Sequence, residues 1–260
     1  TDYNGYPVLP MAIDRDFVFV LSPSAESTID IVNESSLFER RTFVAQFPLP
    51  PYQQGDWGNY VKAAVHGILE IGLVDSKQSV GFQAVVGGTI PEAAGLSSSS
   101  ALVVASALAF LTANGKDVGK EQLAELLARA ERYVGSEGGG MDQAVSLLAE
   151  TGNALKIDFF PLHTQLVPLP ENLSFVVCNS LIRAPKSESI RYAYNRRVIE
   201  CRLATALVAR AFQMRFGKNL RPNRLADISG ENLGLEQDTI DKMVLETIGE
   251  KPLSLNVISQ

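Results

Sequence analysis

The chain has 260 residues, of which 46% are hydrophobic and 20% are charged, and its formal net charge is −6. This balance is typical of a globular protein with a full hydrophobic core, and it excludes an intrinsically disordered chain. It also disfavours a nucleic-acid-binding protein, because the lysines and arginines form no basic cluster in the sequence.

The cysteine content and the hydropathy pattern indicate the compartment. No apolar run approaches the roughly 20 residues that are needed to span a bilayer, and residues 1–7 do not resemble a signal peptide. The two cysteines, Cys178 and Cys201, are too few for a disulfide-stapled secreted domain. We therefore expect a soluble cytoplasmic protein that has free thiols and no membrane partner.

The first part of the chain predicts strands followed by a helix. Residues 17–21 have the pattern of a buried strand, and 29–32 and 42–45 are shorter strand candidates. The proline-rich residues 47–51 cannot continue a central strand, because proline lacks the N–H that a sheet requires. A helix is expected over about 57–71, where apolar residues recur on one helical face.

The middle of the chain alternates helices with glycine-rich loops. Residues 79–86 predict a strand, and 98–112 predict a helix that is apolar nearly all round and therefore buried. A second helix, over 120–134, is amphipathic. The glycine-rich loop 135–140 then leads to a further helix at about 142–149.

The last part of the chain is expected to form a second domain. Residues 154–159 and 173–178 read as strands and 189–213 as a long helix, whereas the segment after Gly217 is more polar and loop-rich. A shift in composition near 161–170 is the candidate boundary. It divides the chain into domains at 1–165 and 166–260.

A run of four serines opens the apolar helix, in the sequence Gly95-Leu96-Ser97-Ser98-Ser99-Ser100. A helix N-terminus has unpaired N–H groups and a partial positive charge, so it attracts anions. The alternative is that serine merely caps a core helix. Four serines after a glycine favour phosphate binding, although the loop is not a Walker A motif.

A second glycine run, Gly138-Gly139-Gly140, is followed closely by Asp142. Consecutive glycines are entropically costly and suit a backbone that must approach a ligand closely. A carboxylate there could orient and deprotonate an acceptor hydroxyl in phosphoryl transfer. The competing interpretation is that Asp142 caps the helix that follows.

Two further residues have a functional and a structural interpretation. Glu131, at the edge of an apolar helical stripe, could bind Mg²⁺ or could be a solvated partner of Arg129 or Arg132. Trp57, the sole tryptophan, could stack on adenine or anchor the proline-rich loop to the core.

Residues 95–101 resemble motif 2 of the GHMP kinases, the family of galactokinase, homoserine kinase, mevalonate kinase and phosphomevalonate kinase. The opening Thr1-Asp2-Tyr3-Asn4-Gly5 is similar to the tail of the galactokinase signature. Residues 131–143 and 195–203 are similar to galactokinases and N-acetylgalactosamine kinases. The chain is therefore identified as a member of this branch of the family.

This resemblance implies an α+β GHMP kinase fold, with a ribosomal-protein-S5-like N-terminal domain that holds the ATP and sugar site and part of a ferredoxin-like C-terminal domain. It implies a monomeric enzyme that uses ATP and Mg²⁺ to phosphorylate the anomeric hydroxyl of galactose or a close analogue. Asp142 would be the catalytic carboxylate, and Asp2, Gly139 and Tyr194 would contact the sugar. The nucleotide site would comprise Gly95, Leu96, Ser97, Ser98, Ser99 and Trp57, with Ser99 and Glu131 as ligands of Mg²⁺.

Three alternatives stay open at this point. The sugar could be N-acetylgalactosamine, or the protein could be a non-catalytic sensor of sugar and ATP, although the intact serines and Asp142 favour an enzyme. A mevalonate or homoserine kinase is disfavoured by the Asp2-Tyr3-Asn4 opening. The family's upstream arginine and its third, glycine-rich motif do not occur in these 260 residues, so we expect the residues by themselves to be catalytically inactive.

Overall fold

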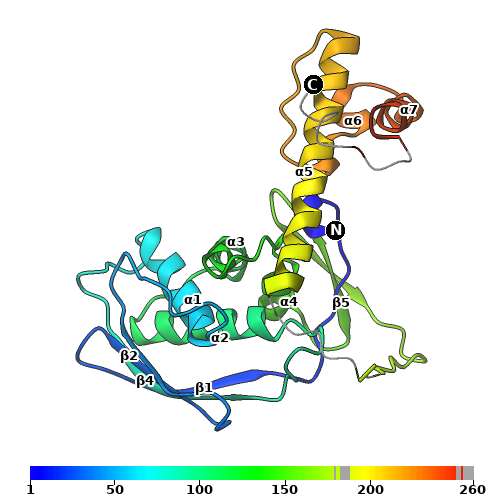
Figure 1. Cartoon of the computed structure of the whole chain (residues 1–260). Helices are drawn as coiled ribbons and strands as arrows, with labels where there is room; N and C mark the ends of the chain where they lie inside the picture. The colour runs from blue at the N-terminus through cyan, green and yellow to red at the C-terminus, as the bar shows by residue number, and fades with distance from the viewer. Residues whose placement is uncertain (179, 182–187, 250–252, 254–260) are drawn as a thin grey trace.

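The computed structural model describes residues 1–178, 180–181, 188–249 and 253. Its larger part is a four-stranded sheet covered on one face by helices (Figure 1). The strands run in the spatial order β1-β4-β2-β3, with β2 and β4 parallel and the other pairs antiparallel. Their bounds are β1 Phe17–Pro23, β2 Thr28–Asn33, β3 Arg41–Val44 and β4 Phe82–Gly88.

The strand predictions are confirmed in place, with two differences in detail. Strand β1 is not buried on both sides, because its side chains alternate and Val18 and Val20 are exposed. Strand β4 begins at Phe82 rather than at Ser79, whose hydroxyl instead donates to the Ala45 carbonyl at 2.7 Å. The sheet therefore has one face in the core and one face in solvent.

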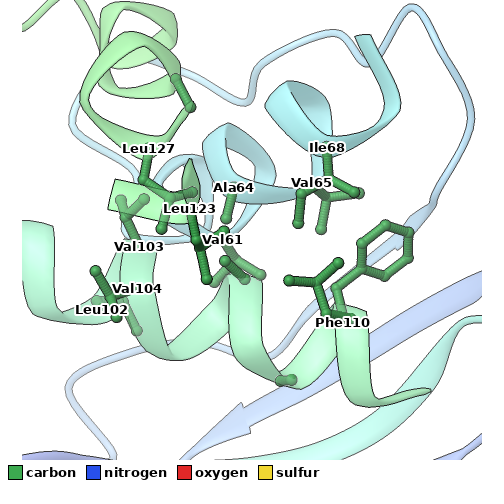
Figure 2. Close-up of a cluster of buried hydrophobic side chains, with 14 of the residues drawn as sticks. Val61, Ala64, Val65, Ile68, Leu102, Val103, Val104, Phe110, Leu123 and Leu127 are labelled. Atoms are coloured by element: carbon green, nitrogen blue, oxygen red, sulfur yellow. The ribbon is translucent and has the colours of Figure 1, made fainter. Parts of the chain in front are cut away.

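The helices of this part bury their apolar faces against the sheet and against one another. Figure 2 shows Val61 and Val65 of one helix facing Val103 and Phe110 of the next. The helix that was predicted to be apolar nearly all round is largely buried, and it ends at Ala113 with Asn114 as its C-cap. The bounds are α1 Gly58–Glu70, α2 Ser98–Ala113, α3 Lys120–Ala130 and α4 Met141–Leu148.

A hairpin of β5 (Asn153–Asp158) and β6 (His163–Pro168) follows α4. The N-terminal segment lies along the free edge of β5, where Val8 and Ile157 exchange backbone hydrogen bonds at 3.0 and 2.9 Å. Strand β6 was not predicted, and it occupies the segment that was taken as a domain boundary. The chain start is thereby fixed to an element about 150 positions later in the sequence.

The C-terminal part is built on one long helix, α5 (Glu188–Phe216), which extends from the larger part to a small helical cluster (Figure 1). Its far end packs with α6 (Gly230–Leu233) and α7 (Gln237–Ile248) around a separate core that includes Phe212 and Met243. The prediction of a loop-rich end was therefore wrong, because the apolar residues of α7 bury one face against α5.

The predicted strand at 173–178 is not formed. Its apolar side chains are exposed, Val176 to 83%, and no strand of the described residues pairs with it. Strand-like composition alone did not specify a partner. Among the described residues, no helix is long and apolar enough to cross a membrane.

Candidate functional site

The serine loop leaves the start of α2 open. Ser97 is the N-cap residue of α2, and its side chain makes no capping hydrogen bond. Its backbone φ is +52°, in the left-handed region, and Gly95 also has a positive φ of +74°. A non-glycine residue held there costs about 1–2 kcal/mol, and such strain concentrates at ligand sites. The geometry therefore favours an anion-binding turn over a self-capped helix.

A buried polar pair lies directly behind this loop. The Ser100 hydroxyl donates to Glu131 Oε1 at 2.7 Å, and the two residues are only 3% and 6% exposed. Glu131 begins the short 3₁₀ helix Glu131–Val134 at the end of α3. The interpretation of Glu131 as a solvated surface residue is therefore wrong. Sequence reasoning did not single out Ser100, although it is the one serine of the run that is fully inside.

The start of α4 is closed by a carboxylate from the other end of this part of the chain. Asp2 accepts backbone hydrogen bonds from Gly139 at 3.1 Å and from Met141 at 3.2 Å, and also from Tyr3 at 2.9 Å. The N-cap residue of α4 is Gly140, and Asp142 lies in the first turn. Asp2 thus accepts hydrogen bonds from the backbone at this helix start.

Two glycines of the run are required by this arrangement. A Cβ on Gly139 would lie 2.3 Å from the Tyr3 nitrogen and 2.4 Å from the Asp2 carbonyl carbon, distances that no side chain can occupy. Gly140 has a φ of +109°, which L-residues rarely adopt. A Cβ on Gly138 would meet nothing within 4 Å. The close approach predicted for this loop is therefore made to the chain's own N-terminal segment.

Tyr194, from α5, lies where these elements meet. Its ring contacts Tyr3 edge to face, with the ring centroids 6.0 Å apart. Burial of its hydroxyl raises the pKa of Tyr194, and the nearby charges of Asp2, Asp142 and Glu131 raise it further. The phenol therefore stays protonated at neutral pH and is able to donate a hydrogen bond, although 41% of the residue surface is exposed.

Helix α5 is tied to the glycine loop by two further contacts. Asn195 Nδ2 donates to the Gly135 carbonyl at 2.8 Å, and Arg202 forms an ion pair with Glu137 at 2.7 Å. The Asn195 Oδ1 atom is buried without a hydrogen-bond partner in the structure. These contacts hold Tyr194 beside the loop, so the long helix takes part in shaping the site.

The structure brings together most of the residues that the sequence singled out, but not Trp57. The charges of Asp2, Asp142 and Glu131 all act on Tyr194. Asp2 is bonded to Gly139, and Glu131 is bonded to Ser100 at the start of α2. Trp57 lies in the core, 8% exposed, with its indole N–H bonded to the Glu39 carbonyl at 3.0 Å and its ring against Phe38. Core packing is the role that the structure gives to Trp57, and the suggested stacking on adenine is not supported.

Comparison with known proteins agrees with this geometry. Residues 59–150 match the GHMP kinases N terminal domain, and residues 1–23 match the galactokinase galactose-binding signature. The chain is 41% identical over 219 residues to a galactokinase of Dictyostelium discoideum, covering 80% of this chain and 42% of that protein. It is 38% identical over 221 residues to a galactokinase of Candida parapsilosis, covering 80% and 43%. The chain thus spans less than half the length of these two relatives.

Among solved structures, Lactococcus lactis galactokinase complexed with galactose superposes with a TM-score of 0.70 at 24% identity, over 94% of this chain and 61% of that one. This likeness establishes the fold, which is the α+β GHMP kinase fold. The matched domain identifies the chain as a member of the GHMP kinase family. Within that family, the matched signature and the identities above show that the chain belongs to the galactokinase branch.

Proposed function

We propose that the complete protein containing these residues transfers the γ-phosphate of ATP to the anomeric hydroxyl of galactose, giving galactose 1-phosphate and ADP. The observation that carries this proposal is the fixation of the signature residue Asp2 on the glycine loop, next to Asp142 and Tyr194. Residues 1–23 match the galactokinase galactose-binding signature, and the Lactococcus lactis galactokinase that superposes on this chain was solved in complex with galactose.

The two helix starts are proposed to bind different parts of the substrates. The N–H groups at the start of α2, with the backbone of Gly95 and Leu96 and the hydroxyls of residues 97–99, would hold the phosphates of ATP. Asp2, Gly139 and Tyr194 would line the sugar site. Tyr194 would act there as a neutral hydrogen-bond donor, because its pKa is raised.

Asp142 is proposed as the general base. Its carboxylate would accept the proton of the sugar hydroxyl as the oxygen forms a bond to the γ-phosphorus and the bond to the ADP oxygen breaks. The position of Asp142 supports this role, because it lies in the first turn of α4 and is near enough to Tyr194 for its charge to raise the pKa of that residue.

The residues present fit a magnesium ion. Glu131 and Ser99 would be its protein ligands, an oxygen donor set of the kind that Mg²⁺ prefers alongside nucleotide phosphates. The buried hydrogen bond from Ser100 to Oε1 fixes the orientation of the Glu131 carboxylate. When bound, the ion would offset the negative charge of the phosphates and of the carboxylates in the site.

We further propose a monomeric cytoplasmic enzyme of two domains. Two separate hydrophobic cores, one within residues 29–162 and one within 208–248, support this division. A boundary directly after 165 would cut strand β6, so we place it just beyond Pro168.

The proposal is tested by measuring ADP release from the complete protein with a panel of sugars. We expect turnover with galactose and none with mevalonate or homoserine. Turnover with N-acetylgalactosamine in preference to galactose would replace the substrate but keep the reaction. Binding of galactose and ATP without ADP release would contradict the enzymatic proposal and favour a sensor.

A further inference from the structure

A cavity of about 480 Å³ lies on the α3 side of the glycine loop. Residues 138–140 form one of its walls, together with α3, the turn between β5 and β6, α5 and Asn223-Arg224. The serine loop, Asp142, Glu131 and Tyr194 do not line it. A volume of this size is within the range of sites for small molecules, about 300–1,000 Å³. The cavity therefore shares Gly139 with the proposed sugar site, but the other residues proposed to bind ATP and sugar do not line it.

The charge of this cavity is opposite to that of the chain. Two carboxylates line it, those of Glu125 and Glu137. Four guanidinium groups line it, those of Arg129, Arg132, Arg202 and Arg224. Four positive charges against two negative charges leave an excess of two, in a protein whose formal net charge is −6. Such a local excess attracts an anion.

Two of the four arginines have no acidic partner among the described residues. Glu137 is occupied by Arg202 at 2.7 Å, and Glu125 accepts a backbone hydrogen bond from Leu162 at 3.4 Å. The salt bridges of the described chain include neither Arg129 nor Arg132. These two are three positions apart at the end of α3, so their side chains project from neighbouring points of one helix face.

The wall opposite these arginines is aromatic. Phe159 and Phe160 lie with their ring centroids 5.9 Å apart, and the Arg224 guanidinium lies 3.1 Å from the centroid of the Phe160 ring. Phe160 has a φ of +63°, which is strained for a bulky residue, and its side chain is 49% exposed. Strained backbone of this kind is found where function requires a particular side-chain direction.

We propose that this cavity is a binding site for a phosphomonoester with a flat, ring-shaped body. The phosphate would be held by the guanidinium groups of Arg129 and Arg132, since planar guanidinium groups bind phosphate oxygens in pairs. The ring would lie against Phe159 and Phe160. The bound molecule would also contact residues 138–140, of which Gly139 donates its N–H to Asp2.

Phenyl phosphate is a suitable probe, because it combines the two chemical features and nothing else. Its binding to the complete protein is measured by ligand-observed NMR at physiological ionic strength, with a non-hydrolysable ATP analogue and galactose present to occupy the proposed active site. We expect saturable binding that weakens at least tenfold in the double variant Arg129→Gln/Arg132→Gln. The matched control Arg196→Gln/Arg197→Gln removes the same charge from an exposed part of α5 that does not line the cavity, and should bind as wild type.

A third variant separates the ring from the phosphate. Phe160→Ala should weaken phenyl phosphate binding while leaving the binding of inorganic phosphate unchanged. The proposal would be overturned if no saturable binding is found, if both double variants lose affinity equally, or if the ATP analogue displaces the probe. Thermal unfolding of each variant confirms that the fold is intact, and all the substituted arginines are exposed.

Discussion

The starts of α2 and α4 are chemically alike but are completed in different ways. Both follow glycine-containing loops, and neither N-cap residue, Ser97 or Gly140, provides a side-chain cap. At α4 the missing acceptor is Asp2, a carboxylate of the same chain 137 positions from Gly139. At α2, within the described part of the chain, no side-chain capping hydrogen bond from the N-cap residue is present. The difference indicates that the start of α4 is bound by the chain's own N-terminal segment, whereas the start of α2 is available to a ligand anion.

The largest combined loss of stability and function is expected from Gly139→Ala, which disrupts the contact between the N-terminal segment and the start of α4. The methyl group would overlap the backbone of Asp2 and Tyr3, so the N-terminal segment must move. We expect a loss of about 1–3 kcal/mol in the free energy of unfolding and the loss of galactose binding. Urea denaturation and calorimetric titration measure these. Gly138→Ala is the control, since its Cβ meets nothing, and equal effects of both substitutions would contradict the account.

A similar loss of stability, with a more limited effect on function, is expected from Ser100→Ala, behind the open helix start. The variant leaves a buried oxygen of Glu131 without its hydroxyl donor, which costs about 1–3 kcal/mol. Because Glu131 loses its fixed orientation, half-maximal activity should need more Mg²⁺. Ser106→Ala in the same helix removes an equally buried hydroxyl that bonds only to the Leu102 carbonyl, and it should leave the titration unchanged. An identical Mg²⁺ titration for Ser100→Ala and wild type would refute the positioning role.

The smallest expected effect is on the free energy of unfolding, which two glycine substitutions within the serine run should change in opposite directions. Ser97 has a left-handed backbone, so Ser97→Gly relieves strain and should leave the stability unchanged or raise it by up to about 1 kcal/mol. Ser98 is helical, so Ser98→Gly should lower the stability by about 0.5–1 kcal/mol. Denaturant unfolding distinguishes the two. Equal destabilisation by both would show that the turn at Ser97 is not strained.

The sequence predicted the open helix start better than the closed one. The serine run and the apolar residues after it are contiguous, so local rules for helix starts were enough to predict α2 almost to the residue. The same local rules could not reveal how the start of α4 is capped, because the acceptor there is Asp2, which is distant in sequence. No local pattern encodes such a contact, and only the resemblance of the opening residues to a known signature associated Asp2 with the site.

Burial accounts for the other differences. Ser99 and Ser100 are the same residue type in the same run, so the sequence cannot tell them apart. Only the packed structure shows that Ser100 is buried and bonded to Glu131. Trp57 is placed in the core by its neighbours Phe38 and Glu39, which precede it by about 20 positions. The exposed apolar residues at 173–178 have strand composition, but a strand also needs a partner.

The most direct test of the proposed kinase is Asp142→Asn in the complete protein, assayed by galactose-dependent ADP release together with ATP binding. The account predicts that kcat falls by about 10²–10⁴-fold, the usual contribution of a general base, while ATP affinity is unchanged. Asp158→Asn is the control, since Asp158 lies on β5 in an exposed ion pair with Lys156 at 3.0 Å. A kcat for Asp142→Asn within about tenfold of wild type, equivalent to about 1.4 kcal/mol, would contradict the assignment of Asp142 as the base.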